Sequence, residues 1–261
     1  MFAWFGERRR SRLRSQQFPH SWLQILKRNV PIFRSLTRED QNELLGHVQV
    51  FLDEKHFEAV GGLDLSDEIR VTIAAQACLL LLHRKTEYFP HLVSIVVYPT
   101  GYNVHEERYV GGGIWEEGPE ARVGHTSSQL RALVLAWDAV LAGAQNPSDG
   151  WNVVLHEFAH QLDFENRTAD GTPALGSHRD YVEWARVMSE ELNALRRADQ
   201  AGVATLLDTY GAQSPTEFFA VATEVFFERP RALRAHHPEL YAEMSRFFQQ
   251  DPVTFSAEAP D

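Results

Sequence analysis

Cysteine is almost absent from this chain. Cys78 is the only one among 261 residues, so no disulfide can form within the chain. Small domains held together by disulfides are therefore excluded, and the composition is consistent with a reducing cytoplasm. Positive charge is also scarce, because 25 Lys and Arg residues face 36 Asp and Glu residues, a formal net charge of -11. This balance argues against a general nucleic-acid-binding protein.

Long hydrophobic runs are missing as well. The most apolar stretch, between Val71 and Leu82, is interrupted by Gln76 and falls short of the roughly 20 residues needed to cross a bilayer. We therefore expect a core helix there and no transmembrane segment elsewhere. The sequence also contains no internal repeat and no glycine-rich phosphate-binding loop. With 44% hydrophobic residues, the chain can nevertheless bury a substantial core.

The N-terminal segment departs from the acidic average. Three aromatic residues are followed there by five arginines: Arg8, Arg9, Arg10, Arg12 and Arg14. No apolar core of about 7–15 residues follows these charges, so the segment does not resemble a secretory signal. We predict a disordered or loosely docked basic tail over residues 1–20, of a kind that contacts membrane surfaces, nucleic acid or acidic partners. A second flexible tail is expected over residues 254–261.

Between these tails, the pattern predicts one α+β domain over residues 21–253, mostly helical with a small mixed sheet. Its helical N-terminal part covers residues 21–90, where capping residues precede apolar residues at helical spacing. Residues 91–253 supply the sheet and the helices of the site. Residues 92–98 and 130–137 are expected to be strands. The long glycine-rich segment between these strands, at about 99–129, is interpreted as a flexible flap near the active site.

A short motif between Val153 and Asp163 carries the chemistry. His156 and His160 are four residues apart, so on a helix their imidazoles lie one turn apart and can reach one ion. Glu157 is rotated by roughly 100° from His156, which lets it reach a water on the metal rather than the metal itself. The apolar residues around the motif indicate a buried helix whose polar side chains need partners. The pattern predicts a metal-activated hydrolase.

A catalytic zinc site needs a third protein ligand and an open position for water. A third histidine at the spacing used by one peptidase class would require glycine at 163 and histidine at 166, where the chain has Asp163 and Asn166. That class is excluded. The remaining common ligand is a glutamate on a second helix, and Glu217 and Glu224 are the candidates. They lie seven residues apart on one helical face, and the spacing does not choose between them. Glu217 also has an alternative role, as the partner of Ser214 in a capping box.

Two acids are candidates for orienting a ligand histidine. Two carboxylates inside an apolar helix are costly unless they are bonded, which supports Glu217 on the metal and Glu224 bonded to a ligand histidine. Asp163, three residues after His160 on the same face, is the other candidate. A solvated aspartate at the end of the helix is the simpler interpretation of Asp163.

Two blocks of the sequence, residues 137–163 and 210–227, closely resemble the Mlc titration factor A family of zinc-dependent peptidases, which are glutamate-zincins. The resemblance extends loosely from about residue 20 to Pro252. It implies a zincin-like fold and one Zn²⁺ per chain, with His156, His160 and Glu217 as ligands and Glu157 as general base. Tyr210 looks like the tyrosine that helps to stabilise the oxyanion in related glutamate-zincins.

By this resemblance, the chain is expected to be a cytoplasmic zinc peptidase that acts on a peptide or protein substrate. Cleavage at peptide ends, as in an aminopeptidase, and cleavage at interior bonds both stay open. The family name reflects capture of the sugar-responsive repressor Mlc, so a repressor of that type is an expected partner. The alternative is a non-catalytic zinc protein that sequesters a transcription factor, and such a protein would not need Glu157. In zincins, an edge strand before the metal helix pairs with substrate, and residues 130–137 are placed for that role or for a purely structural one.

Overall fold

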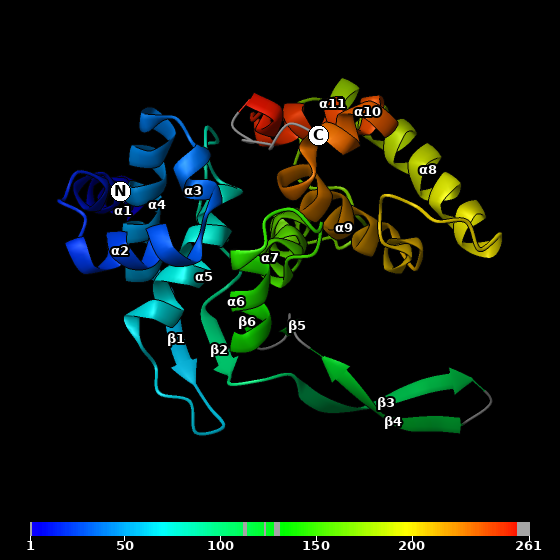
Figure 1. Ribbon diagram of the computed structural model, residues 1–261, viewed down its shortest axis with the longest axis horizontal. Helices are drawn as coiled ribbons and strands as arrows, with labels where there is room; N and C mark the ends of the chain where they lie inside the picture. The colour runs from blue at the N-terminus through cyan, green and yellow to red at the C-terminus, as the bar shows by residue number, and fades with distance from the viewer. Residues whose placement is uncertain (1, 112–113, 123, 128–130, 255–261) are drawn as a thin grey trace.

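The computed structural model describes residues 2–111, 114–122, 124–127 and 131–254, with residues 2–5 and 102–127 described through their backbone. A four-stranded sheet in the order β1-β2-β6-β5 lies near the middle of the molecule, with helices on either side (Figure 1). Its members are β1 (His56–Ala59), β2 (Ser94–Tyr98), β6 (Ala132–Ala136) and β5 (Gly124–Ser127). The first three are parallel, and β5 is antiparallel to β6. The predicted α+β class, mostly helical with a small mixed sheet, is confirmed.

The N-terminal helices gather on one side of this sheet (Figure 1). They are α1 (Phe2–Arg14), α2 (His20–Asn29), α3 (Ile32–Ser35), α4 (Arg38–Glu54) and α5 (Asp67–Leu79). Their starts follow from the capping residues in the sequence: the hydroxyl of Thr37 accepts from the Asp40 amide at 3.1 Å, and that of Ser66 accepts from Ile69 at 3.3 Å. The predicted core helix over Val71–Leu82 corresponds to α5 and the turn that follows it. No helix in the described part of the chain is long and apolar enough to span a membrane.

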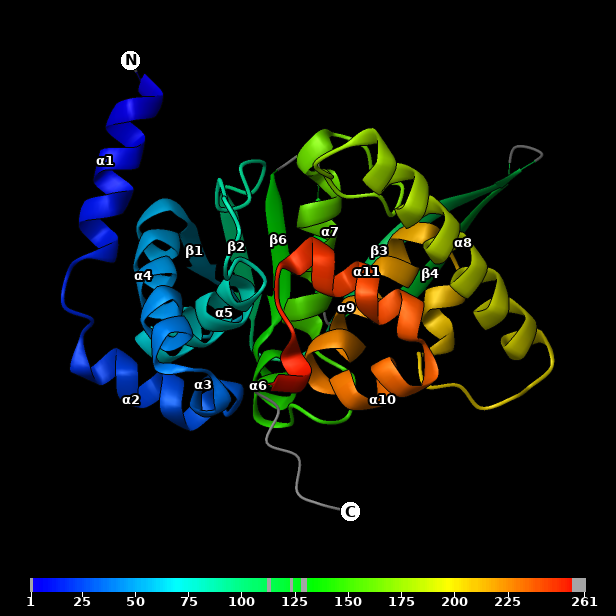
Figure 2. The same ribbon diagram turned by 90° about the horizontal axis from the view of Figure 1, so that it is seen from above.

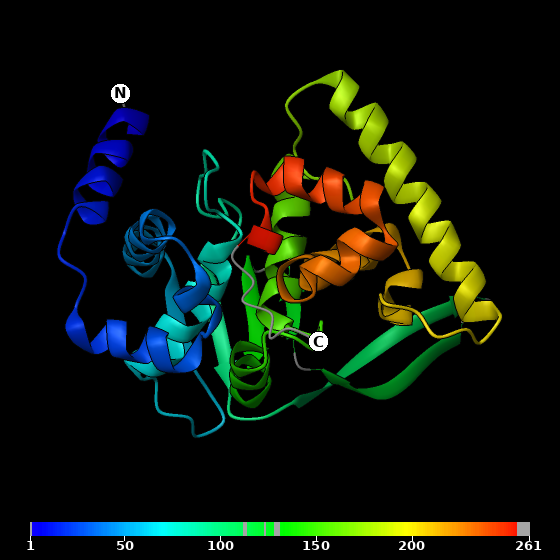
Figure 3. The ribbon, with the colours of Figure 1, turned by 45° about the horizontal axis from the view of Figure 1, so that its top comes forward.

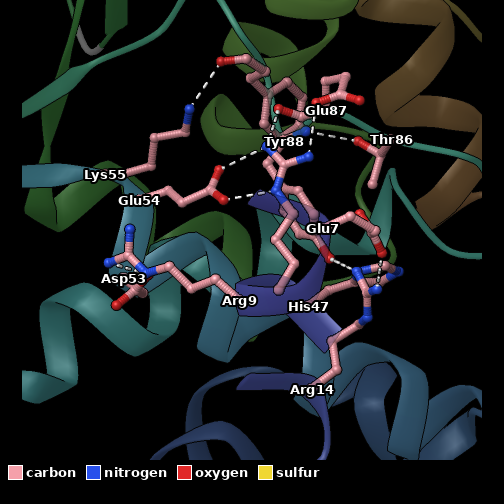
Figure 4. Close-up of polar contacts among 12 residues, drawn as sticks. Glu7, Arg9, Arg14, His47, Asp53, Glu54, Lys55, Thr86, Glu87 and Tyr88 are labelled. Atoms are coloured by element: carbon pink, nitrogen blue, oxygen red, sulfur yellow. Dashed lines mark hydrogen bonds and ion pairs between the residues drawn. The ribbon is translucent and has the colours of Figure 1, made fainter. Parts of the chain in front are cut away.

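Helix α1 replaces the disordered or loosely docked tail that the sequence suggested for residues 1–20. It packs against α4, and its arginines reach acids on neighbouring segments (Figure 4). Arg10 contacts Glu54 and Glu87, each at 2.7 Å. The Arg14 guanidinium donates to the hydroxyl of Tyr88 at 3.2 Å. Composition alone suggested a disordered or loosely docked tail, but oppositely charged groups from α4 and from the segment after α5 hold the helix in place. The predicted C-terminal tail from 254 onward lies outside the described residues, apart from Thr254 itself.

The helices of the second half lie next to the N-terminal group, with α5 contacting both α6 and α7, and the long helix α8 runs along the outer edge (Figures 2 and 3). They are α6 (Trp137–Gln145), α7 (Val153–Asp163), α8 (His178–Gln200), α9 (Pro215–Glu228), α10 (Pro230–His236) and α11 (Pro238–Phe248), with short 3₁₀ turns η1 (Phe164–Asn166), η2 (Thr209–Ala212) and η3 (Pro252–Thr254). Helix α7 lies centrally between the two groups of helices (Figure 1) and contacts α5, α6, α9, β5 and β6.

Two features of the sheet differ from the sequence-based expectations. The segment interpreted as a flexible flap contains an antiparallel hairpin of β3 (Tyr102–Gly111) and β4 (Ile114–Arg122), which projects away from the helices (Figure 1). The strand predicted at 130–137 is present as β6, but its interpretation as an edge strand is wrong. It pairs with β2 on one side and with β5 on the other. In the described sheet, β5 therefore occupies the edge beyond β6.

Candidate metal centre

Helix α7 is anchored by its cap and by one buried aromatic side chain. The side-chain oxygen of Asn152 accepts from the amides of Val154 and Leu155, both at 3.1 Å, and this fixes where the helix begins. On the far side, the ring of Phe158 packs against that of Phe89 with centroids 4.8 Å apart. Because Phe158 is fully buried in the core, the face carrying the two histidines is turned toward α9.

Helix α9 begins at a proline preceded by a cap, as its sequence predicts. The hydroxyl of Ser214 accepts from the amide of Glu217 at 3.1 Å, and Pro215 occupies the first helical position. The carboxylate of Glu217 points instead to the histidines of α7, so it does not complete the capping box with Ser214. Of the predicted capping box, the hydrogen bond from the Glu217 amide to Ser214 is therefore present, while the Glu217 side chain faces the histidines.

The structure brings His156, His160 and Glu217 together. The Nε2 atoms of the two histidines are 3.2 Å apart, and Glu217 Oε2 lies 3.0 Å from His156 Nε2 and 3.5 Å from His160 Nε2. For a tetrahedral ion with ligands at about 2.0–2.1 Å, ligand atoms lie roughly 3.3 Å apart. The three measured separations fall on both sides of that value. Two imidazoles and one carboxylate are also a donor set that zinc uses in catalytic sites, so the residues present fit this metal.

Glu224 holds the first histidine from the opposite side. Its Oε1 accepts from His156 Nδ1 at 2.7 Å, and its Oε2 accepts from the backbone amide of Asn152 at 2.5 Å. A hydrogen bond at Nδ1 leaves Nε2 to face Glu217 and His160. Of the two acids that the sequence left open, Glu217 is therefore next to both Nε2 atoms, and Glu224 lies behind His156.

These contacts control protonation at the centre. Burial alone would lower the pKa of His156, but hydrogen bonds to Glu217 and Glu224 outweigh burial and raise it well above its usual value. Burial would raise the pKa of Glu217, yet hydrogen bonds from both histidines lower it. In the metal-free protein, the centre therefore pairs a cationic imidazole with an anionic carboxylate.

The two residues expected to act on substrate lie at the same centre. Glu157 follows His156 on α7 and is 7% exposed. Tyr210 belongs to η2, which contacts α9, and its ring centroid lies 6.0 Å from that of His156. Tyr210 is 47% exposed, so its ring is available to a ligand arriving from solvent. This exposure does not fit a tyrosine that is merely packed at the start of a helix.

Asp163 has surroundings that neither sequence interpretation anticipated. It is 1% exposed, so it is not a solvated helix-end residue. Its Oδ2 accepts from the backbone amide of Gly171 at 2.9 Å, and burial raises its pKa. Asp163 therefore ties the end of α7 to the following loop through this hydrogen bond.

Comparison with known proteins identifies the family. The model of the glucose-regulated metallo-peptidase M90 family matches residues 4–249. The chain belongs to this family. It is similar to an uncharacterized protein of Synechocystis sp., slr2042, with 34% identity over 245 residues that cover 94% of this chain and 89% of the relative. It is also similar to Mlc titration factor A of Yersinia pestis and of Yersinia pseudotuberculosis, each 28% identical over 230 residues, 86% of this chain and 83% of the relative. Membership of the M90 family agrees with the resemblance found in the two sequence blocks, and a metallopeptidase family implies a metal ion.

Sequence reasoning missed three polar residues around the centre. Asn152 caps α7, Gln76 on α5 contacts Asn152, and Glu228 on α9 does the same. Asn152 had a detectable signal, because an asparagine directly before an apolar helical run is a typical cap. Gln76 stood out only as a polar residue in an apolar helix, and Glu228 only as an acid four residues after Glu224.

A second group with metal-ligand atoms lies away from α7. It consists of Asp40, Glu43 and His83. His83 Nε2 pairs with Asp40 Oδ1 at 2.9 Å, and Glu43 accepts from the His83 amide at 2.8 Å and contacts His47 at 3.2 Å. These ion pairs and hydrogen bonds account for the group as a link between α4 and the segment after α5.

Proposed function

We propose that this chain is a zinc-dependent peptidase. The observation that carries the proposal is the convergence of His156, His160 and Glu217, with Glu157 beside them on α7. Membership of a metallopeptidase family supports it. The three residues would hold one Zn²⁺ per chain. When bound, the ion supplies Lewis acidity that polarises the scissile carbonyl and makes a water molecule a stronger acid.

The side chains around this position have distinct tasks. Glu157 accepts the proton of the attacking water and passes it to the leaving amine. Tyr210 donates a hydrogen bond from its hydroxyl to the oxyanion that forms at the carbonyl carbon. Glu224 accepts from His156 Nδ1 and thereby keeps the His156 ring in one orientation.

The peptide substrate is proposed to add to the sheet at β5. In the described sheet this strand is at the edge beyond β6, and α7 contacts it. An extended peptide that pairs with such an edge gains main-chain hydrogen bonds and is held next to the metal helix. This assignment replaces the earlier interpretation of β6 as the substrate-pairing strand. Cleavage at an amino terminus, as in an aminopeptidase, and cleavage at interior bonds are both compatible with it.

The decisive experiment uses a mixture of unbiased peptides and mass spectrometry. Zinc-loaded wild type should cleave the mixture, and zinc-loaded Glu157→Gln should lose turnover by about 10²–10⁴-fold while keeping its zinc. Glu165→Gln is the matched control, since Glu165 lies in η1 after the same helix. Equal cleavage by wild type and Glu157→Gln would refute the assigned general base.

A second proposal concerns a regulatory partner. Relatives of this chain are named Mlc titration factor A, which supports a transcriptional repressor of that type as a binding partner in the cytoplasm. A non-catalytic protein that sequesters the repressor would bind it equally well with Glu157→Gln and would cleave no peptide in any form. Pull-down of purified repressor by the two proteins, beside the peptide assay, distinguishes sequestration from proteolysis.

A further inference from the structure

One buried polar side chain connects the N-terminal helices to the metal helix. Gln76 is 3% exposed on α5, between residues that are otherwise mostly apolar. Its Nε2 donates to the carbonyl of Thr72 at 3.2 Å within the same helix. Its Oε1 accepts from Asn152 Nδ2 at 2.9 Å. The side chain of Gln76 thus extends from α5 to the residue that caps α7.

The amide of Asn152 uses its full hydrogen-bonding capacity. Its oxygen accepts from two backbone amides at the start of α7, and its nitrogen donates to Gln76 and to Glu228 Oε1, the latter at 3.0 Å. An amide turned the other way would set its NH₂ against two N–H groups and its oxygen against two oxygens. Gln76 and Glu228 therefore determine which way the Asn152 side chain points.

The backbone of Asn152 leads directly to the metal centre. Its N–H donates to Glu224 Oε2, and Glu224 Oε1 accepts from His156 Nδ1. Glu228 also accepts from the amide of Gly150 at 3.1 Å, so α9 holds the chain on both sides of Trp151. A displacement of Asn152 would move the N–H that holds the Glu224 carboxylate, and with it the ring of His156.

We propose that Gln76, Asn152 and Glu228 are positioning residues of the metal centre. They fix the Asn152 side chain and backbone, which orient Glu224 and through it the imidazole of His156. This inference rests on the function proposed above, in which His156 is a metal ligand. It extends the centre to α5, a helix that contributes no ligand.

The two possible roles of Asn152, helix cap only or positioning residue, predict different effects of substitutions at position 152. Asn, Asp and Ser are about equally good caps, so a residue that only caps α7 can be replaced by either of the others. Aspartate at this position would bring a carboxylate oxygen against Gln76 Oε1 and would offer no N–H to Glu228 Oε1. Serine would reach the helix amides but neither of those oxygens. Positioning therefore requires asparagine, whereas capping does not.

The test measures metal binding by the full-length chain rather than turnover alone. Asn152→Asp, Asn152→Ser and Gln76→Leu are compared with wild type and with Thr72→Val. Thr72 is the matched control because it is a buried polar residue one turn before Gln76 and contacts Asn29 rather than Asn152. Zinc affinity is measured by competition with a chelator, and the visible spectrum is recorded after loading with Co²⁺. Thermal unfolding of the metal-free proteins shows that each variant is folded.

We expect the three test variants to bind zinc about 10–100-fold more weakly than wild type, with an altered Co²⁺ spectrum. Thr72→Val should keep both wild-type properties. If Asn152→Asp and Asn152→Ser keep the wild-type zinc affinity and Co²⁺ spectrum, Asn152 acts only as a helix cap and the inference is overturned. If wild type binds zinc but cleaves no peptide, the proposed function fails while the positioning role is still judged by affinity. If wild type binds no zinc, both are refuted.

Discussion

His156 is held between two carboxylates, and this would determine how the proposed metal centre takes up an ion. Glu224 accepts at Nδ1, and Glu217 lies 3.0 Å from Nε2. With the pKa of His156 raised, the imidazole of the metal-free protein carries a proton on both nitrogens at neutral pH. The proton at Nε2 must leave before that nitrogen can bind a metal. Metal uptake and proton release are therefore coupled at this residue.

Zinc affinity should consequently rise with pH. Between pH 6 and pH 8 most of His156 is protonated, so affinity should increase by up to about tenfold per pH unit, and binding at pH 7 should release about one proton. Titration calorimetry in buffers of different ionisation enthalpy measures that proton. A binding enthalpy that does not change with the buffer would contradict the protonated state of His156.

Tyr210 gives a second prediction for a single residue. Tyr210→Phe removes the proposed donor to the oxyanion, so turnover should fall by about 10²–10³-fold, or roughly 3 kcal/mol of transition-state stabilisation, with zinc affinity little changed. Steady-state kinetics and metal analysis of the variant provide the measurement. Tyr181→Phe, which removes a hydroxyl that accepts from the Leu175 amide, is the matched control and should keep wild-type turnover. Undiminished turnover in Tyr210→Phe would remove Tyr210 from the mechanism.

The sequence was sufficient to predict that His156, His160 and a downstream glutamate come together, but not which glutamate. Two histidines four residues apart specify a common face because helical geometry is local. The spacing between Glu217 and Glu224 left two candidates, because which carboxylate meets Nε2 depends on how α9 packs against α7. The contacts of Asn152 with Gln76 and Glu228 join residues more than seventy positions apart, and no local pattern encodes them.

Helix α9 presents three acids toward α7 and the segment that leads into it. Glu217 faces both histidines, Glu224 binds His156, and Glu228 accepts from Asn152 and Gly150. Burial raises the pKa of Glu228 to about 9, because the hydrogen bond from Asn152 does not compensate for lost solvation and Asp149 adds a like charge. Glu228 is thus neutral at pH 7, which limits the negative charge on this helix.

The raised pKa of Glu228 makes the stability of the protein depend on pH. The pKa of Glu228 is about 9 in the folded protein and near 4.5 in the unfolded chain. Its protonation therefore stabilises the folded state fully below about pH 4.5, and this stabilisation is lost as the pH rises toward 9. The loss should approach about 1.4 kcal/mol per pH unit over that range. Denaturant unfolding of metal-free wild type and Glu228→Gln from pH 5 to pH 9 tests this. The variant should have a shallower slope, and parallel curves would contradict a neutral Glu228.

Element boundaries were more predictable than strand neighbours. Thr37 and Ser214 indicated the starts of α4 and α9, and Asp64 or Ser66 indicated that of α5, where Ser66 is the cap, because a cap acts within one turn. The edge of the sheet was assigned to the wrong strand, because alternation and β-propensity do not specify which strands pair. Strand β5, with the sequence Gly-His-Thr-Ser, has too few apolar residues to be recognised in advance.

At the scale of the whole molecule, the basic N-terminal segment forms helix α1, which is docked on α4. Arg10 is the centre of this contact, since it bridges Glu54 at the end of α4 and Glu87 in the segment after α5. Arg9 adds a pair with Asp53 at 2.7 Å. The arginines suggested binding to an external partner when only the sequence was considered. The acids that Arg9 and Arg10 meet belong to the chain itself and became visible only in the fold.

Removing this docking contact should lower stability without changing the metal centre. Arg10→Ala leaves Glu54 without its bidentate partner and should cost about 1–3 kcal/mol of unfolding free energy. Zinc affinity should equal that of wild type. Arg12→Ala, an exposed residue on the same helix, should change stability by less than about 0.5 kcal/mol. Denaturant unfolding of the two variants gives the comparison, and equal stability for both would show that α1 contributes little.

The parallel pairing of β1, β2 and β6 also has a consequence for biosynthesis. His56 pairs with Ser94, and Ser94 pairs in turn with Ala132. Each strand pair can therefore form only after a long stretch of chain has left the ribosome. Pairings between such distant segments close large loops and are slow. The site assembles later still, because Glu217 is made well after β6. A nascent chain arrested before Glu217 would expose an apolar helix α7 with no α9 to cover it, and we expect that intermediate to be a preferred client of ribosome-associated chaperones.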